Sequence, residues 1–202
     1  MRSIVETQEA ERNSLAIVLR DNINQTLSSC KLMLESVAAH ESASVEVKKS
    51  YDFIQKAIEQ LKVLTIDLHP SPVLDLGFQE GMQEYISSFV KLYELPVYFN
   101  CTNEADDGMV ENIQIPTFRI LQDSLLMLNH YSVSTNIEIN VEKTAEQYII
   151  TIKYNDAIFN FDISCKEWQN IRVRLEYLDG KIISLAQEEG MSGIRFEYSA
   201  IT

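Results

Sequence analysis

The first third of the chain carries two apolar stripes with helical spacing. Residues 5–39 contain no Gly or Pro, and apolar side chains recur there every three or four positions. They are Leu15, Leu19, Ile23, Leu27, Cys30, Leu34 and Val37. After the polar stretch 40–44 the same spacing returns at Val47, Tyr51, Ile54, Ile58, Leu61, Leu64 and Leu68. This pattern predicts two long amphipathic helices joined by a turn.

Each predicted helix is far longer than the average helix of a globular protein. At about 1.5 Å per residue, each would extend for on the order of 40–50 Å. A hairpin of two such helices cannot cover its own apolar stripes, whereas two hairpins that pair into a four-helix bundle can. We therefore predict a homodimer formed by an N-terminal helical domain, residues 1–72.

The remaining residues, 73–202, have a different character. Two prolines and a glycine in the stretch 69–77 end the second helix and predict the domain boundary. Beyond it we expect an acidic loop at 103–108, and a helix that Gly180 caps at its C-terminus. Helices are expected at 78–93, 115–130 and 166–178, and strands at 96–102, 137–141, 148–154, 158–163, 182–186 and 194–200.

These elements predict an α+β fold class. A helical hairpin is followed by an α/β sandwich, in which one mixed sheet carries helices on one face.

The composition describes an ordered acidic protein. Among 202 residues, 46% are hydrophobic, and 17 basic residues stand against 30 acidic ones, for a net charge of −13. Nucleic acid and anionic lipid would be repelled at long range, so we expect no nucleic-acid partner and favour a partner with a basic rim.

The cysteines and the apolar runs indicate the cellular compartment of the protein. Cys30, Cys101 and Cys165 form no CxxC pair and no Cys/His cluster, which predicts a reducing compartment and no metal site. No run approaches the roughly 20 apolar residues of a membrane span, and residues 1–10 lack the apolar core of a signal peptide. We expect a cytoplasmic protein without membrane insertion, or the cytoplasmic part of a larger sensor.

Several segments resemble one family in the expected order. Residues 11–27, ERNSLAIVLRDNINQTL, resemble the first bundle helix of sensor histidine kinases, in the class paired with helix-turn-helix response regulators. Residues 67–78, DLHPSPVLDLGF, resemble the end of that family's second helix, and 118–132 and 171–182 resemble the first and last helices of its GHKL-type ATPase domain. The resemblance implies a histidine-phosphotransfer-like hairpin at 1–72, a GHKL-like domain at 73–202, and a receiver domain or a partner kinase as binding partner.

The phosphoacceptor histidine of the family falls on Arg20, in LRD where LHD is expected. A guanidinium is protonated at every biological pH and has no lone pair to attack phosphorus. Two positions earlier, where the family has an acidic residue, this chain has Val18. No histidine lies between residues 1 and 39. Autophosphorylation at this position is therefore predicted to be lost.

The nucleotide boxes also depart from the family. No glycine lies between Gly108 and Gly180, and YNDAIFNF at 154–161 stands where a DxGxG box would fall. Met127 aligns with the family's magnesium-binding Asn, and Asp123 with its Glu. A thioether is a poor ligand for a hard cation. We predict that no nucleotide cofactor is bound, and that side chains such as Ile158 and Phe159 fill the region.

Asp21 and Gln25 preserve the family's DxxxQ spacing, which places both on one helical face. In such kinases this pair resembles a phosphatase motif, in which the amide orients water toward a phospho-aspartate. The alternative is that Asp21 and Gln25 are ordinary solvent-exposed residues of a bundle helix, without a functional role. The resulting hypothesis is a catalytically degenerate histidine kinase core that acts as a dimeric signalling or docking module. The alternative is a response-regulator phosphatase that uses Asp21 and Gln25 without ATP chemistry.

Overall fold

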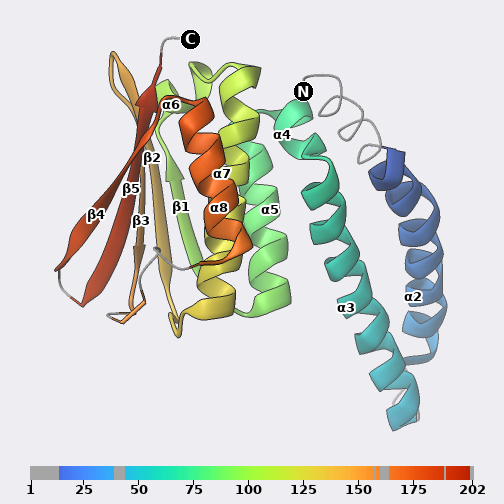
Figure 1. Cartoon of the computed structure of the whole chain (residues 1–202). Coiled ribbons are helices and arrows are strands. Elements are labelled where there is room, and N and C mark those ends of the chain that lie inside the picture. The colour runs from blue at the N-terminus through green and yellow to red at the C-terminus, as the bar shows by residue number, and fades with distance from the viewer. Residues whose placement is uncertain (1–13, 39–43, 157, 160–163, 189, 201–202) are drawn as a thin grey trace. The chain divides into compact units, whose positions relative to one another are not determined.

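The computed structural model describes residues 14–38, 44–156, 158–159, 164–188 and 190–200 (Figure 1). The chain divides into two compact units. The first comprises residues 1–71 and 87–92, and the second comprises residues 72–86 and 93–202. In the part of the chain described, no helix has both the length and the hydropathy to cross a membrane.

The first unit contains the predicted helical hairpin. Residues 14–18 are α-helical, Leu19–Asn24 form a π-helix (η1), and α2 continues over Gln25–Ala38. Helix α3, Val45–Leu68, lies antiparallel beside α2 (Figure 1). Ser44 is its N-cap, and the Ser44 hydroxyl accepts a hydrogen bond from the Val47 N–H at 3.4 Å. Residues 5–13 and 39 of the predicted first helix lie outside the described residues.

The second unit is built on a five-stranded sheet in the order β1-β2-β3-β5-β4. Strand β1 pairs with β2 in parallel, and all other neighbours are antiparallel, so the sheet is mixed as predicted. The strands are β1 Val97–Cys101, β2 Ile137–Lys143, β3 Gln147–Tyr154, β4 Lys181–Glu188 and β5 Met191–Ser199.

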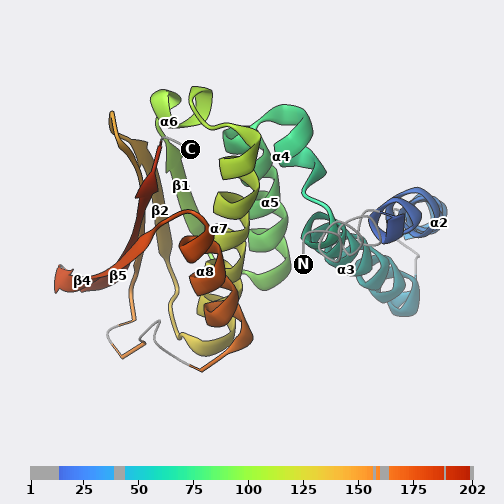
Figure 2. The ribbon, with the colours of Figure 1, turned by 45° about the horizontal axis from the view of Figure 1, so that its top comes forward.

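One face of the sheet carries helices. Figures 1 and 2 show α7 (Glu111–Tyr131) and α8 (Lys166–Tyr177) on that face, and the side chains of β3 that point to it are fully or almost fully buried. Helix α5 (Phe78–Tyr93) contributes Tyr85, whose ring meets Phe118 of α7 edge-on at 5.4 Å. The predicted α+β class is confirmed.

Two short helices replace predicted irregular segments. The expected acidic loop contains α6, Asn103–Asp107, where Ala105 is fully buried and the Asp106 carboxylate accepts a hydrogen bond from the Gln79 N–H at 2.8 Å. The predicted break contains α4, Ser71–Leu76, because a proline in the first turn of a helix lacks only an N–H that has no partner there.

The predicted strand at 158–163 is wrong where it can be checked. Ile158 and Phe159 are not in a strand, because both N–H groups donate to the side chain of Asp156 instead of to a neighbouring strand. Residues 160–163 lie outside the described part of the chain.

The end of α8 uses a different residue from the predicted Gly180. Asp179 adopts the left-handed conformation, with φ of 49°, and the Gly180 N–H donates to the Leu175 carbonyl at 2.7 Å. Aspartate tolerates this backbone region better than most residues. Gly180 is required for space, since a Cβ there would lie 2.9 Å from Leu175 Cδ2.

Candidate functional site

The predicted docking face lies on the first helix of the hairpin. Arg20 and Asp21 belong to η1, and Gln25 is the first residue of α2. All three side chains are exposed. Arg20 Nε lies 3.1 Å from Asp21 Oδ1, and each of these side chains is about half exposed. The face therefore presents a cation, an anion and an amide within two helical turns.

The π-helix at this position was not predicted. Two hydroxyls near its end bond back to the main chain: Thr26 Oγ1 donates to the Asn22 carbonyl at 2.8 Å, and Ser29 Oγ donates to the Gln25 carbonyl at 2.9 Å. Short π-helices are rare and are frequently found at functional sites. The sequence signal was the group of polar residues Asn22, Asn24 and Gln25 in the middle of a helix, since asparagine is unfavourable in a regular α-helix.

The hairpin also leaves many large apolar side chains in contact with solvent. Leu32, Met33 and Phe53 are each 66–71% exposed, and Ile23 is 45% exposed. Others are Leu15, Ile17, Val18, Val37, Val45 and Leu64. Contiguous exposed apolar surface is unusual on a monomer and is typical of an interaction surface.

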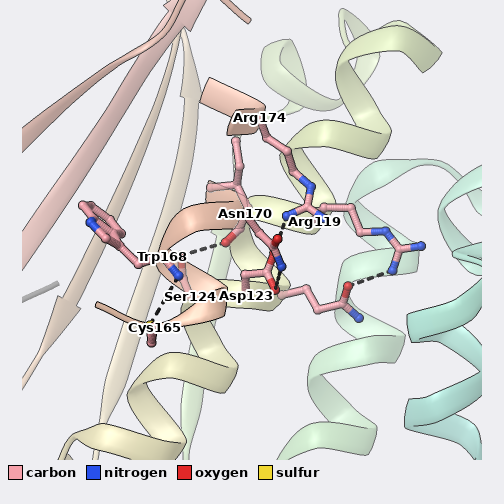
Figure 3. A network of polar contacts seen from close by, with 9 residues as sticks. Arg119, Asp123, Ser124, Cys165, Trp168, Asn170 and Arg174 are labelled. Atoms are coloured by element: carbon pink, nitrogen blue, oxygen red, sulfur yellow. Dashed lines mark hydrogen bonds and ion pairs between the residues drawn. The ribbon is translucent and has the colours of Figure 1, made fainter. Parts of the chain in front are cut away.

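In the second unit, Asp123, the residue that aligns with the family's Glu, is engaged by the chain itself. Asp123 of α7 is 8% exposed, and its carboxylate forms an ion pair with Arg174 of α8 (Figure 3). Asn170 Nδ2, also on α8, lies 3.5 Å from Asp123 Oδ1. On the same helix as Asp123, Arg119 donates to Gln122 Oε1 at 2.9 Å. The Asp123 charge is thus neutralised by a guanidinium of this chain.

The position aligned with the magnesium ligand is part of the core. Met127 lies on α7 and is fully buried, so it offers neither a hard oxygen ligand nor access to solvent. Among the described residues, no group of three or more His, Cys, Asp or Glu is placed to hold a metal ion.

Sequence reasoning missed Asp156, which organises the segment that replaces the DxGxG box. Its Oδ2 accepts hydrogen bonds at 2.9 Å from the Val133 N–H and the Ser132 hydroxyl. Its Oδ1 accepts from the N–H groups of Ile158, at 2.9 Å, and Phe159, at 3.1 Å. The bond from Val133 contributes most to lowering the pKa of this carboxyl, and the other three reinforce it while partial burial opposes them. All four acceptor directions of the carboxylate are therefore used.

The prediction that Ile158 fills the nucleotide region is wrong, because its side chain is 93% exposed. Oδ1 of Asp156 accepts hydrogen bonds from the N–H groups of Ile158 and Phe159, and this local bonding leaves the Ile158 side chain at the surface. Phe159 is half-buried, and its ring meets Tyr154 edge-on at 5.5 Å. Burial next to this ring raises the pKa of Tyr154 to about 12.

A long helical hairpin, followed by a mixed sheet with helices on one face, is the fold expected for a sensor histidine kinase core. The histidine kinase domain of the Erythrobacter litoralis EL346 blue-light activated histidine kinase superposes with a TM-score of 0.54 at 8% identity, over 95% of this chain and 94% of that one. A longer structure of the same kinase gives the same TM-score and identity, over 73% of this chain and 54% of that one.

A comparison with curated proteins points the same way. The chain is 22% identical over 155 residues to the oxygen sensor histidine kinase NreB of Staphylococcus carnosus, which covers 75% of this chain. It spans less than half of that protein, 44% of its length. No protein-family model matches. These similarities confirm the predicted resemblance to sensor histidine kinase cores, and at such identities they establish the fold alone.

Proposed function

We propose that this chain is a two-component sensor histidine kinase core that has lost its nucleotide chemistry and acts as a dimeric docking module. Its partner is the receiver domain of a response regulator, or a second histidine kinase. The observation that carries the proposal is Arg20, an exposed guanidinium at the phosphoacceptor position that is paired with Asp21. This group cannot accept a phosphoryl group, but it can bind one through charge-assisted hydrogen bonds.

The second unit supports the loss of nucleotide chemistry. Arg174 forms an ion pair with the carboxylate of Asp123, and all four acceptor directions of the Asp156 carboxylate are used within the chain. Met127, in the magnesium position, is buried. A nucleotide would have to break an internal ion pair and a saturated hydrogen-bond cluster before it made contacts of its own.

The exposed apolar surface of the hairpin supports dimerisation. Two hairpins that pair into a four-helix bundle would bury the side chains that α2 and α3 leave in solvent. We propose residues 1–72 as the dimerisation domain and 73–202 as the GHKL-like domain.

A second candidate function is dephosphorylation of a response regulator. The exposure of Asp21 and Gln25 one turn apart favours it, because an amide held there could orient a water molecule. This activity needs no ATP, so it is compatible with the loss of nucleotide chemistry proposed for the second unit.

The experiment follows the decay of phosphorylated receiver domains, beginning with one encoded beside this gene, in the presence and absence of this protein. Receiver binding is measured in parallel. For a docking module, Asp21→Lys weakens binding by at least about tenfold, the size of one charge-assisted contact. The decay rate stays unchanged.

The matched control is Glu35→Lys, the same charge reversal at an exposed position of α2 about 21 Å further along the helix axis. It should leave binding within twofold. For a phosphatase, Gln25→Ala slows an accelerated decay by on the order of ten- to a hundredfold. If the protein neither binds any receiver of the source organism nor accelerates its dephosphorylation, both functions of this face are contradicted.

A further inference from the structure

The face of the sheet that carries no helices contains a hollow. It has a volume of about 210 Å³ and is lined by residues of β3, β4 and β5. Its floor is Gly193 of β5, which is the register partner of Lys153 on one side and of Leu185 on the other. Gly193 keeps this floor low, since a Cβ there would lie 3.1 Å from Leu185 Cδ1 and from the Ile152 carbonyl oxygen.

The groups around the hollow are hydrogen-bond donors. Lys153 and Arg195 line it together with Thr151 and Ser192. No acidic side chain is among the lining residues. In a chain with a net charge of −13, the two charged side chains that line the hollow are both cations.

These two cations are incompletely compensated. Arg195 lies 3.8 Å from Glu197, whose other oxygen is held more closely by Lys181 at 2.9 Å. Lys153 stands opposite Glu138 in the sheet register, yet it forms no ion pair within the described residues. Two like charges on adjacent strands repel each other unless an anion lies between them.

One donor of Arg195 has no acceptor. Its Nε is buried from solvent and finds no hydrogen-bond partner among the described residues. A buried unsatisfied N–H is unfavourable, and native proteins have few of them outside sites that receive a ligand, water or ion.

We propose that this hollow binds a small phosphate monoester. The guanidinium of Arg195, the ammonium of Lys153 and the hydroxyl of Thr151 supply donors from several directions, which suits the three terminal oxygens of a tetrahedral phosphate. The two positive charges match its dianion. The side chains of Leu185 and Met191 line the same hollow and give the organic part of the ester an apolar wall. This proposal is independent of the function assigned to the hairpin.

The test is a titration of the full chain with phenyl phosphate at constant ionic strength, followed through the backbone amide NMR signals of Gly193 and Arg195. We expect saturable shifts, and weaker binding of inorganic phosphate, which lacks the apolar part. Arg195→Gln should weaken binding by on the order of tenfold, because it removes a charge-assisted donor. Glu197 remains paired with Lys181 in this variant, so the sheet keeps its other ion pair.

The matched control is Arg172→Gln, the same substitution at an exposed position of α8 that does not line the hollow. It should leave affinity within twofold. Shifts that do not saturate, or an equal loss in Arg172→Gln, would mean general charge screening and overturn the site. Benzoate binding as tightly as phenyl phosphate would overturn the preference for phosphate.

Discussion

The hairpin and the second unit differ in the apolar side chains that they bury completely. In the hairpin, Leu32 and Phe53 are 66% and 71% exposed, whereas in the sheet unit Tyr148 and Phe196 are fully buried. Val133 and Ile158 of the second unit are also exposed, so the difference lies in the core: the second unit has many side chains with no exposed surface, and the described residues of the hairpin have none. This contrast supports the proposal that the hairpin pairs with a second copy.

Charged side chains also differ in solvent exposure between the hairpin and the second unit. Arg20 and Asp21 on the hairpin keep about half of their side-chain surface in solvent. Asp123 and Asp156 in the sheet unit are buried and bound by other groups of the chain. Charges that face solvent can bind a partner, while charges that are satisfied internally stabilise the fold.

The largest expected effect is on assembly. Ile23→Asp should raise the dimer dissociation constant at least about a hundredfold, since each of two symmetric copies loses apolar burial and places a carboxylate in the interface. Light scattering at micromolar concentration measures it. Gln60→Asp adds the same charge at an exposed polar position of α3 and serves as the control. A wild-type chain that is already monomeric contradicts the dimer.

The next effect is on the folding of the sheet unit. Asp156→Asn should lower the free energy of unfolding by about 2–4 kcal/mol, because an amide cannot accept all four hydrogen bonds. Denaturant unfolding followed by circular dichroism measures this loss.

The same pair of proteins tests the lowered pKa of Asp156. A carboxyl whose pKa is lower when folded stabilises the protein above its unfolded pKa, and this contribution is lost as the pH falls through the folded value. The stability difference between wild type and Asp156→Asn should be largest at neutral pH and shrink below about pH 4. A difference that stays constant down to pH 2 would contradict the assigned bonding.

A smaller effect is expected at the ion pair between α7 and α8. Arg174→Met should lower the free energy of unfolding by about 1–2 kcal/mol, since it leaves Asp123 partly buried with Asn170 as its remaining α8 partner. In the Asp123→Asn background the same substitution should have less effect, as in a double-mutant cycle. Additive losses would mean that the two side chains are not coupled.

The sequence predicted elements better than it predicted contacts. The spacing of Leu15, Leu19 and Ile23 was sufficient to place a helix, because helical periodicity is local. Asp106 and Asp156 could not be assigned in this way, since their main-chain partners Gln79 and Val133 lie 27 and 23 positions away.

The site followed the same rule. Arg20, Asp21 and Gln25 could be proposed from the sequence because their spacing along one helix is local. The pairing of Asp123 with Arg174, 51 positions apart, required the packing of α8 against α7. The π-helix at Leu19–Asn24 was missed because its main-chain hydrogen bonds leave no distinct spacing in the sequence.

Calorimetric titration of the full chain with ATP and Mg²⁺ tests the central claim most directly. The account predicts no saturable heat at millimolar nucleotide, for wild type and for Arg174→Met alike, because Met127 is buried and Asp156 is saturated in both. A saturable binding curve for the wild type, with a dissociation constant in the micromolar range, would contradict it.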